Sequence, residues 1–128
     1  MRNNFLWFGF GMLALCASIP ACRHDAEITP AITGPVSFHG QVLPLLHANC
    51  ALSGCHAGTS PQSGINFEDS VAYSTLFTKH LVDTLHPAQS LIVLQINSVS
   101  TPMPPSGLMS QGKRDLVLAW IQQGAKNN

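Results

Sequence analysis

Two cysteines and a histidine lie within seven residues, in the segment Cys50-Ala-Leu-Ser-Gly-Cys55-His56. Each thiol can form a thioether with one vinyl group of a haem, and the adjacent imidazole can then bind the iron. The usual motif has two residues between the cysteines, whereas four separate them here. Along a helix, five positions mean a rotation of ~140° and a rise of ~7.5 Å, so residues 50–55 cannot be continuous helix if both thiols hold one haem. Ser53 and Gly54 favour a chain reversal that would bulge the additional residues outward.

The first 21 residues have the features of a secretory signal peptide. Arg2 precedes an apolar run over residues 5–19, which is shorter than the ~20 residues that a membrane-spanning helix needs. The run ends in Ile-Pro-Ala-Cys22, which resembles a bacterial lipobox with cleavage before Cys22 and a lipid on its sulfur. Ordinary cleavage that leaves Cys22 unmodified is the alternative. We therefore expect an exported protein, on the periplasmic side or at the cell surface, anchored by lipid to a bacterial membrane.

Export leaves two other interpretations of the cysteine pair open. Cysteines in an oxidising compartment commonly form disulfides, and the other two of the four cysteines would be removed or lipidated. A Cys50–Cys55 disulfide therefore competes with haem attachment. Zinc is a third possibility, because Cys50, Cys55 and His56 supply three ligands. A zinc site would need a fourth ligand, such as His47 or His80.

Length and composition limit the chain to one small domain. Its 128 residues leave no room for a second core. The formal net charge is zero and charged residues make up 9% of the chain, so it lacks the basic field that nucleic-acid binding requires. Residues 22–35 are polar and rich in turn formers, which predicts a tether. The folded domain is expected over residues 36–128.

Helical signals in residues 36–128 predict an all-α domain of about four short helices. No segment alternates apolar and polar residues long enough to indicate a strand. The expected helices cover residues 38 to about 48, about 71 to 77, 87 to about 97, and 111–123. The predicted N-caps are Ser37 for the first helix, Asp69 or Ser70 for the second and Ser110 for the last. Pro44 predicts a kink in the first helix, and Pro87 suits the first position of the third. Gly124 is expected to end the last helix.

A proline-rich segment, Thr-Pro-Met103-Pro-Pro, carries the candidate for the sixth iron ligand. An electron carrier needs a second axial ligand besides His56, and a methionine thioether is soft enough for iron and raises the reduction potential. The prolines fix their own φ angles and restrict the residues before them, so the loop loses little entropy in presenting the sulfur. Met103 could instead be an apolar gap filler. The other candidates for this position are Met109, which we expect in the core, and His80 and His86.

Taken together, residues 37–125 resemble a class I c-type cytochrome domain, in particular the monohaem domains of bacterial exported lipoproteins. The resemblance implies that Cys50 and Cys55 bind the haem vinyls, that His56 is the proximal ligand and that Met103 is the distal ligand. It also implies that the first and last helices cross beside the haem, with Phe38 or Leu46 against Leu116 and Trp120. The matching segments are Phe38, Val42-Leu-Pro-Leu-Leu46, Cys50, Cys55-His56, Gly64-Ile-Asn-Phe67, Pro87-Ala-Gln-Ser-Leu91, Met103-Pro-Pro105 and Trp120-Ile-Gln-Gln-Gly-Ala125.

The function that this resemblance implies is one-electron transfer through one covalent haem c. Such a protein is a carrier that exchanges electrons with redox partner proteins, and no catalytic pair of nucleophile and base or of carboxylates stands out in the sequence. Two alternatives remain. One is a haem sensor or peroxidase-like domain with an exchangeable sixth ligand. The other is a structural lipoprotein without haem, in which Cys50 and Cys55 form a disulfide.

Overall fold

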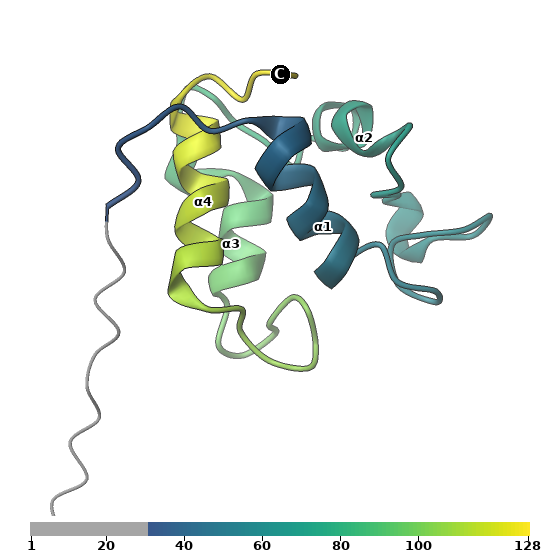
Figure 1. The fold of residues 1–128 in the computed structure, drawn as a ribbon. Helices are drawn as coiled ribbons and strands as arrows, with labels where there is room; N and C mark the ends of the chain where they lie inside the picture. Colours follow the sequence, from purple (N-terminus) through teal and green to yellow (C-terminus); the bar gives the residue numbers. More distant parts are fainter. Residues whose placement is uncertain (1–30) are drawn as a thin grey trace, which may run out of the picture.

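The computed structural model describes residues 31–128, and the expected signal peptide and the lipid on Cys22 lie outside this range. The described part is helical and contains no strand, which confirms the predicted all-α class. None of its helices has the length and apolar character needed to cross a membrane. In Figure 1, α3 lies behind α4, α1 runs beside them, and the loop joining α3 to α4 forms one end of the domain. The elements are the π-helical turn η1 (Phe38–Val42), α1 (Leu43–Asn49), the 3-10 turn η2 (Gln62–Gly64), α2 (Ala72–Thr78), the 3-10 turn η3 (Pro87–Gln89), α3 (Leu91–Asn97) and α4 (Gln111–Gln122).

The first helix begins as predicted, with Ser37 as its N-cap. The Ser37 hydroxyl accepts a hydrogen bond from the Gly40 N–H at 3.0 Å, which satisfies one free donor of the first turn. The π-helical turn η1 passes into α1 at Leu43, directly before Pro44. Because proline has no N–H to donate to the preceding turn, the change of hydrogen-bond pattern falls where the sequence predicts a kink.

The predicted N-cap of the second helix and the predicted continuity of the third helix are wrong. Val71 occupies the N-cap of α2, and neither Asp69 nor Ser70 caps it; instead the Glu68 carbonyl accepts hydrogen bonds from the Val71 and Ala72 N–H groups. The expected third helix is divided into η3 and α3 at Ser90, whose ψ of 131° is not helical. Pro87 does stand at the first position of η3, as expected.

The aromatic core packs the first helical turn of the domain against its last helix. The ring centroids of Phe38 and Trp120 lie 5.2 Å apart, and those of Phe38 and Tyr73 are also 5.2 Å apart. Phe38, Val117, Trp120 and Ile121 are all buried, whereas Leu116 is only partly buried. The expected packing of the first helix against the last is therefore confirmed for Phe38 and Trp120.

The last helix also fixes the segment that enters the domain. The Gln123 side chain accepts a hydrogen bond from the Val36 N–H at 2.7 Å and donates one to the Gly34 carbonyl at 3.1 Å. Val36 is buried, and Ile32 before it is partly buried against the core. Gly124 follows with a φ of +93°, which glycine adopts without strain, and α4 ends just before it as predicted.

Candidate functional site

The segment between Cys50 and His56 is a closed turn. Helix α1 ends at Asn49, the Cys55 N–H donates to the Leu52 carbonyl at 2.9 Å, and the His56 N–H donates to the Cys50 carbonyl at 3.1 Å. Gly54 has a φ of +78°, a left-handed conformation that favours glycine. Residues 50–55 are therefore not continuous helix, and the turn returns the chain so that Cys50 is bonded through its backbone to His56. Ser53 and Gly54 at the tip are exposed, as the expected outward bulge requires, whereas Leu52 is 47% exposed and also lines the larger of the cavities described below.

The His56 imidazole is held from two sides. Its Nδ1 lies 3.3 Å from the Ile65 carbonyl oxygen, and its ring meets the ring of Phe67 edge-on with centroids 5.5 Å apart. A carbonyl can only accept, so this hydrogen bond places a proton on Nδ1 and leaves Nε2 as the nitrogen available to a metal. The Phe67 N–H also donates to the His56 carbonyl at 2.8 Å. This arrangement fixes the orientation and tautomer that a metal-binding imidazole needs.

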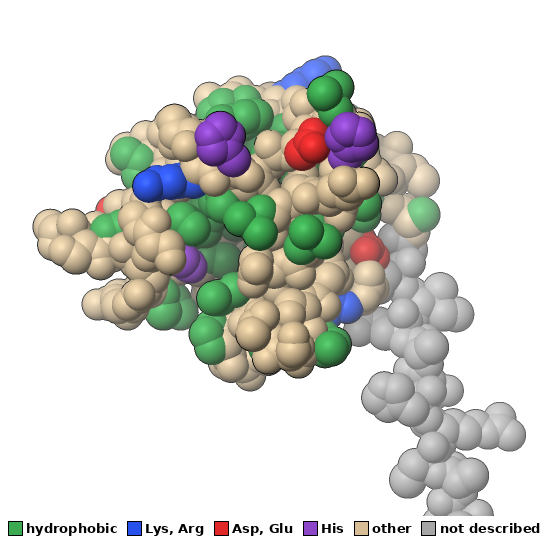
Figure 2. Space-filling model, turned by 180° about the vertical axis from the view of Figure 1, so that it is seen from behind, with side chains coloured by type: hydrophobic (Ala, Val, Ile, Leu, Met, Phe, Trp, Pro, Cys, Tyr) green, Lys and Arg blue, Asp and Glu red, His purple; other side chains and the backbone are tan. Residues whose placement is uncertain are grey.

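Two adjoining cavities open beside this histidine. One, of about 350 Å³, has apolar walls that include Phe67, Leu81 and Ile92; the other, of about 580 Å³, reaches to Cys55 and the proline loop. Figure 2 shows hydrophobic side chains gathered on this side of the molecule, around a recess in its surface. No charged side chain lines either cavity in the described part of the chain. The residues that line both cavities are Cys50, His56, Ser63 and Met103.

The two thiols are free and lie in different surroundings. Burial raises the pKa of the Cys50 thiol to about 11, and the neighbouring Cys55 adds to the effect. Cys50 is therefore a neutral thiol at ordinary pH, because the buried site disfavours the thiolate. Both cysteines line the larger cavity, and Cys50 lines the smaller one as well.

Met103 is brought to the same cavities from the other half of the chain. Its N–H donates to the Gln95 carbonyl of α3 at 3.2 Å, and its side chain is 38% exposed. Met109, in contrast, is buried in the core and lines neither cavity, as expected. The histidines proposed as replacements, His80 and His86, are exposed and line neither cavity.

The described residues do not form the metal-binding cluster that the zinc interpretation needs. Within residues 31–128, no three His, Cys, Asp or Glu side chains come together in a way that could hold a metal ion. His47 lies 4.0 Å from Asp69 on the surface, and His80 lines a separate shallow cavity beside Leu85.

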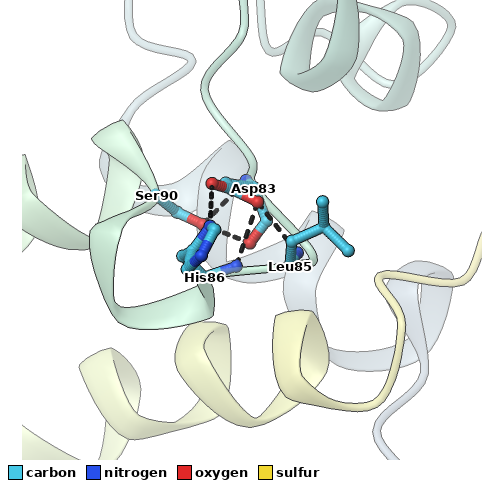
Figure 3. A network of polar contacts seen from close by, with 4 residues as sticks. All are labelled: Asp83, Leu85, His86 and Ser90. Carbon is cyan, nitrogen blue, oxygen red and sulfur yellow. Dashed lines mark hydrogen bonds and ion pairs between the residues drawn. The ribbon is translucent and has the colours of Figure 1, made fainter.

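Sequence reasoning missed a polar network that supports the wall of the smaller cavity (Figure 3). The buried Ser90 hydroxyl accepts from the Asp83 N–H at 2.9 Å and donates to the Asp83 carbonyl at 3.2 Å. The Asp83 carboxylate accepts from the Leu85 and His86 N–H groups at 2.8 and 3.0 Å, and it lies 3.2 Å from His86 Nδ1. The network fixes the start of α3, which contributes Ile92 to the cavity wall.

Sequence reasoning also missed Ser63 and Gln95 as wall residues. Ser63 adopts a left-handed φ of 56°, and nothing in the sequence marks that conformation for a serine. Gln95 falls within the predicted third helix, where no sequence signal marks it as a site residue. In the structure it is a polar residue in the mostly apolar wall of the smaller cavity.

The chain was compared with protein-family models, with curated proteins and with solved structures, and none of the three comparisons returned a match. The functional assignment therefore depends on the residues and the geometry of this site.

Proposed function

We propose that the chain is a monohaem c-type electron carrier, attached to a membrane by a lipid on Cys22. One observation carries the proposal. Two thiols, a fixed imidazole and a thioether, from Cys50, Cys55, His56 and Met103, line one pair of adjoining cavities. These are the attachment and axial groups that a c-type haem requires.

The cavities fit such a group in size and chemistry. Their volumes of about 350 and 580 Å³ fall in the range of roughly 300–1,000 Å³ usual for cofactor and ligand sites. The apolar walls suit a porphyrin, and the donor set combines one nitrogen and one soft sulfur. A bound haem supplies the reversible uptake of one electron.

The chain's own residues would bind, orient and shield this group. Cys50 and Cys55 would form the thioether bonds, and the neutral Cys50 thiol places no buried charge in the apolar wall. Ile65 fixes the ring of His56 through Nδ1, so that Nε2 is left for the iron. Phe67, Leu81 and Ile92 exclude water from the apolar side.

The cellular setting of the proposal comes from residues outside the described range. A signal peptide over residues 1–21 and a lipid on Cys22 would place the domain on the periplasmic side or at the cell surface. The part of the expected tether that precedes residue 31 would let the domain approach redox partner proteins, since Ile32 and Gly34 are already held by the domain. In this role the protein carries electrons and is not an enzyme.

Expression with a cytochrome c maturation system tests the proposal directly. We expect an intact mass that includes one haem, and a haem spectrum that survives denaturation because the attachment is covalent. The Cys50→Ala and Cys55→Ala variants should each retain haem through one thioether, and the double variant should lose it on denaturation. A colourless wild-type protein in which Cys50 and Cys55 form a disulfide would contradict the proposal.

The axial ligand needs a separate comparison. Met103→Ala should keep covalent haem but lower its reduction potential, because the thioether that favours the reduced iron is gone. Met109→Ala is the matched control, since that side chain is buried away from the cavities, and its potential should stay close to that of the wild type. An unchanged spectrum in Met103→Ala would move the ligand to His80, His86 or Met109.

A further inference from the structure

Lys79 places a positive charge next to the wall of the smaller cavity. A Cβ built on Gly64 would stand 3.0 Å from the Lys79 Nζ and 3.8 Å from its Cε. Gly64 follows Ser63, which lines both cavities. The buried Leu81, two residues after Lys79, lines the smaller cavity. The Lys79 ammonium therefore lies at the rim of the smaller cavity, beside its lining but not part of it.

The backbone holds Lys79 in this place. Lys79 is the C-cap of α2, and its N–H donates to the Thr75 carbonyl at 3.0 Å. His80 then adopts a left-handed φ of 52°, and the chain continues from α2 into the cavity wall at Leu81. With its backbone fixed here, the Lys79 side chain crosses to the backbone of Gly64, which has no side chain to block it.

The charge of Lys79 is unpaired within residues 31–128. Both ion pairs in that range join a histidine to an aspartate, and neither includes Lys79. Other cations are engaged: Lys113 donates a hydrogen bond to Asn49 at 3.5 Å. Arg114 donates to the Met109 carbonyl at 2.7 Å. Lys79 is therefore a cation at the rim of the site that can still accept a bound carboxylate as its partner.

We propose that Lys79 binds a propionate carboxylate of the haem, at the edge of the porphyrin away from the cysteines. This inference depends on the proposed haem function. Thioethers to Cys50 and Cys55 would fix the vinyl half of the porphyrin, and the propionates are on the opposite half of the macrocycle. Because Cys55 lines the larger cavity alone, that opposite half is directed through the smaller cavity, toward Leu81 and Lys79.

The charge-free lining makes the rim the place for a carboxylate. Neither cavity has a charged side chain in its lining within the described part of the chain. A carboxylate held inside such a wall would lose its hydration without a compensating partner. At the rim, an ammonium supplies a charge-assisted hydrogen bond, which is roughly twice as strong as a neutral one. Lys79 would thus neutralise one propionate and fix that edge of the porphyrin.

Carbodiimide coupling of the pigmented holoprotein tests the contact directly. The reagent takes up one water as it joins an amine to a carboxylate that touches it, so an amide between Lys79 Nζ and a propionate should form. Digestion should then release one conjugate that contains the haem, the peptide with residues 50–56 and the peptide with Lys79. Lys79→Gln should lose this conjugate. Lys113→Gln is the matched control, because it removes the same charge beside Asn49 of the larger cavity and should keep the conjugate.

The reduction potential gives a second readout. Loss of the Lys79 charge would leave the negative propionate uncompensated, which favours the ferric iron. We therefore expect a lower potential in Lys79→Gln than in wild type and in Lys113→Gln, whereas Lys79→Arg keeps the charge and should stay closer to wild type. Added salt should reduce the difference between Lys79→Gln and Lys113→Gln, because charges near the surface are screened.

Two glycine variants separate the position of the ammonium from its charge. Gly64 and Gly58 have left-handed φ angles of +65° and +82°, so alanine strains the backbone at both. At Gly64 the added Cβ would meet Lys79, whereas at Gly58 it would meet nothing within 4 Å. Per pigmented molecule, the yield of the Lys79 conjugate should fall in Gly64→Ala and stay unchanged in Gly58→Ala.

The outcomes distinguish this inference from the function on which it depends. A pigmented wild type that gives no haem conjugate through Lys79 would overturn the inference alone, as would equal potentials in Lys79→Gln and Lys113→Gln at low salt. A wild type without covalent haem would overturn the proposed function and this inference together.

Discussion

The Phe38 ring packs on the Trp120 ring with centroids 5.2 Å apart and planes tilted by 35°. Phe38 belongs to the first helical turn of the described domain and Trp120 to its last helix, so this contact joins segments that are distant in the sequence. Both side chains are fully buried, and the Trp120 Nε1–H donates to the Lys126 carbonyl at 2.9 Å.

Replacing Trp120 by alanine should therefore destabilise the domain strongly. Removal of a buried aromatic side chain typically costs about 3–5 kcal/mol through lost burial and the cavity left behind. Phe77→Ala is the matched control, because Phe77 belongs to the same aromatic group but is 38% exposed, so a smaller loss is expected. Urea unfolding of the two variants measures the difference. Equal losses would mean that Trp120 is not the centre of the core.

Gly54→Ala tests the turn that brings the two thiols to one site. Gly54 has a φ of +78°, and an added Cβ would meet nothing within 4 Å, so the cost is purely one of backbone conformation. A left-handed non-glycine residue costs roughly 1–2 kcal/mol. Gly34→Ala is the control, since its Cβ would also meet nothing and its φ is not in the left-handed region. We expect a loss of unfolding free energy and of haem incorporation in Gly54→Ala alone, measured by denaturation and intact mass.

The stability of the domain should depend on pH through Asp83. The hydrogen bond from the His86 N–H is the main cause that lowers the pKa of the Asp83 carboxyl, and the Leu85 N–H and the His86 ring add to it. A carboxyl whose pKa is lower in the folded state stabilises the fold above its unfolded pKa of about 3.9. That contribution disappears as the pH falls from this value through the folded pKa.

Asp83→Asn isolates this contribution, because asparagine keeps an oxygen that can accept the backbone hydrogen bonds but does not titrate there. Urea midpoints measured from about pH 6 to about pH 2 should fall less steeply in Asp83→Asn than in wild type. Parallel curves would show that Asp83 has the same pKa in the folded and unfolded chain.

The two thiols of the chain without haem should differ in their rate of alkylation. The thiolate is the reactive form, and a pKa of about 11 in place of 9.0 leaves Cys50 with roughly one hundredth of the thiolate of an unperturbed thiol. Iodoacetamide followed by peptide mass spectrometry should therefore find Cys55 labelled first at pH 8. Equal labelling in the folded chain would contradict the burial of Cys50, and denaturant should remove the difference.

Local signals in the sequence predicted most of the fold. The Ser37 cap, the change of helix type before Pro44 and the end of α4 before Gly124 each depend on residues within one helical turn. The break at Ser90 could not be predicted in this way, because its hydroxyl bonds to Asp83, which is outside the helix. The same holds for the left-handed Ser63, whose conformation has no marker in its own sequence.

The candidate site was predictable in its residues but not in its geometry. Adjacent Cys55 and His56 are visible in the sequence, and so is a methionine among prolines. Only the fold shows that Met103 reaches the cavities beside His56 while His80 and Met109 do not. Distance along the chain gives no information about such contacts, because they depend on how α3 and the loop of residues 99–108 pack.

The bond from the His56 N–H to the Cys50 carbonyl has a consequence for protein engineering. Since the segment is closed at its base, Ser53 at its tip sets neither end of that bond, and this residue is exposed and lines neither cavity. Short peptides inserted next to Ser53 would thus extend away from the domain while the bond between His56 and Cys50 is kept. A surface anchor for an electrode, introduced there, would sit within one turn of the proposed haem site.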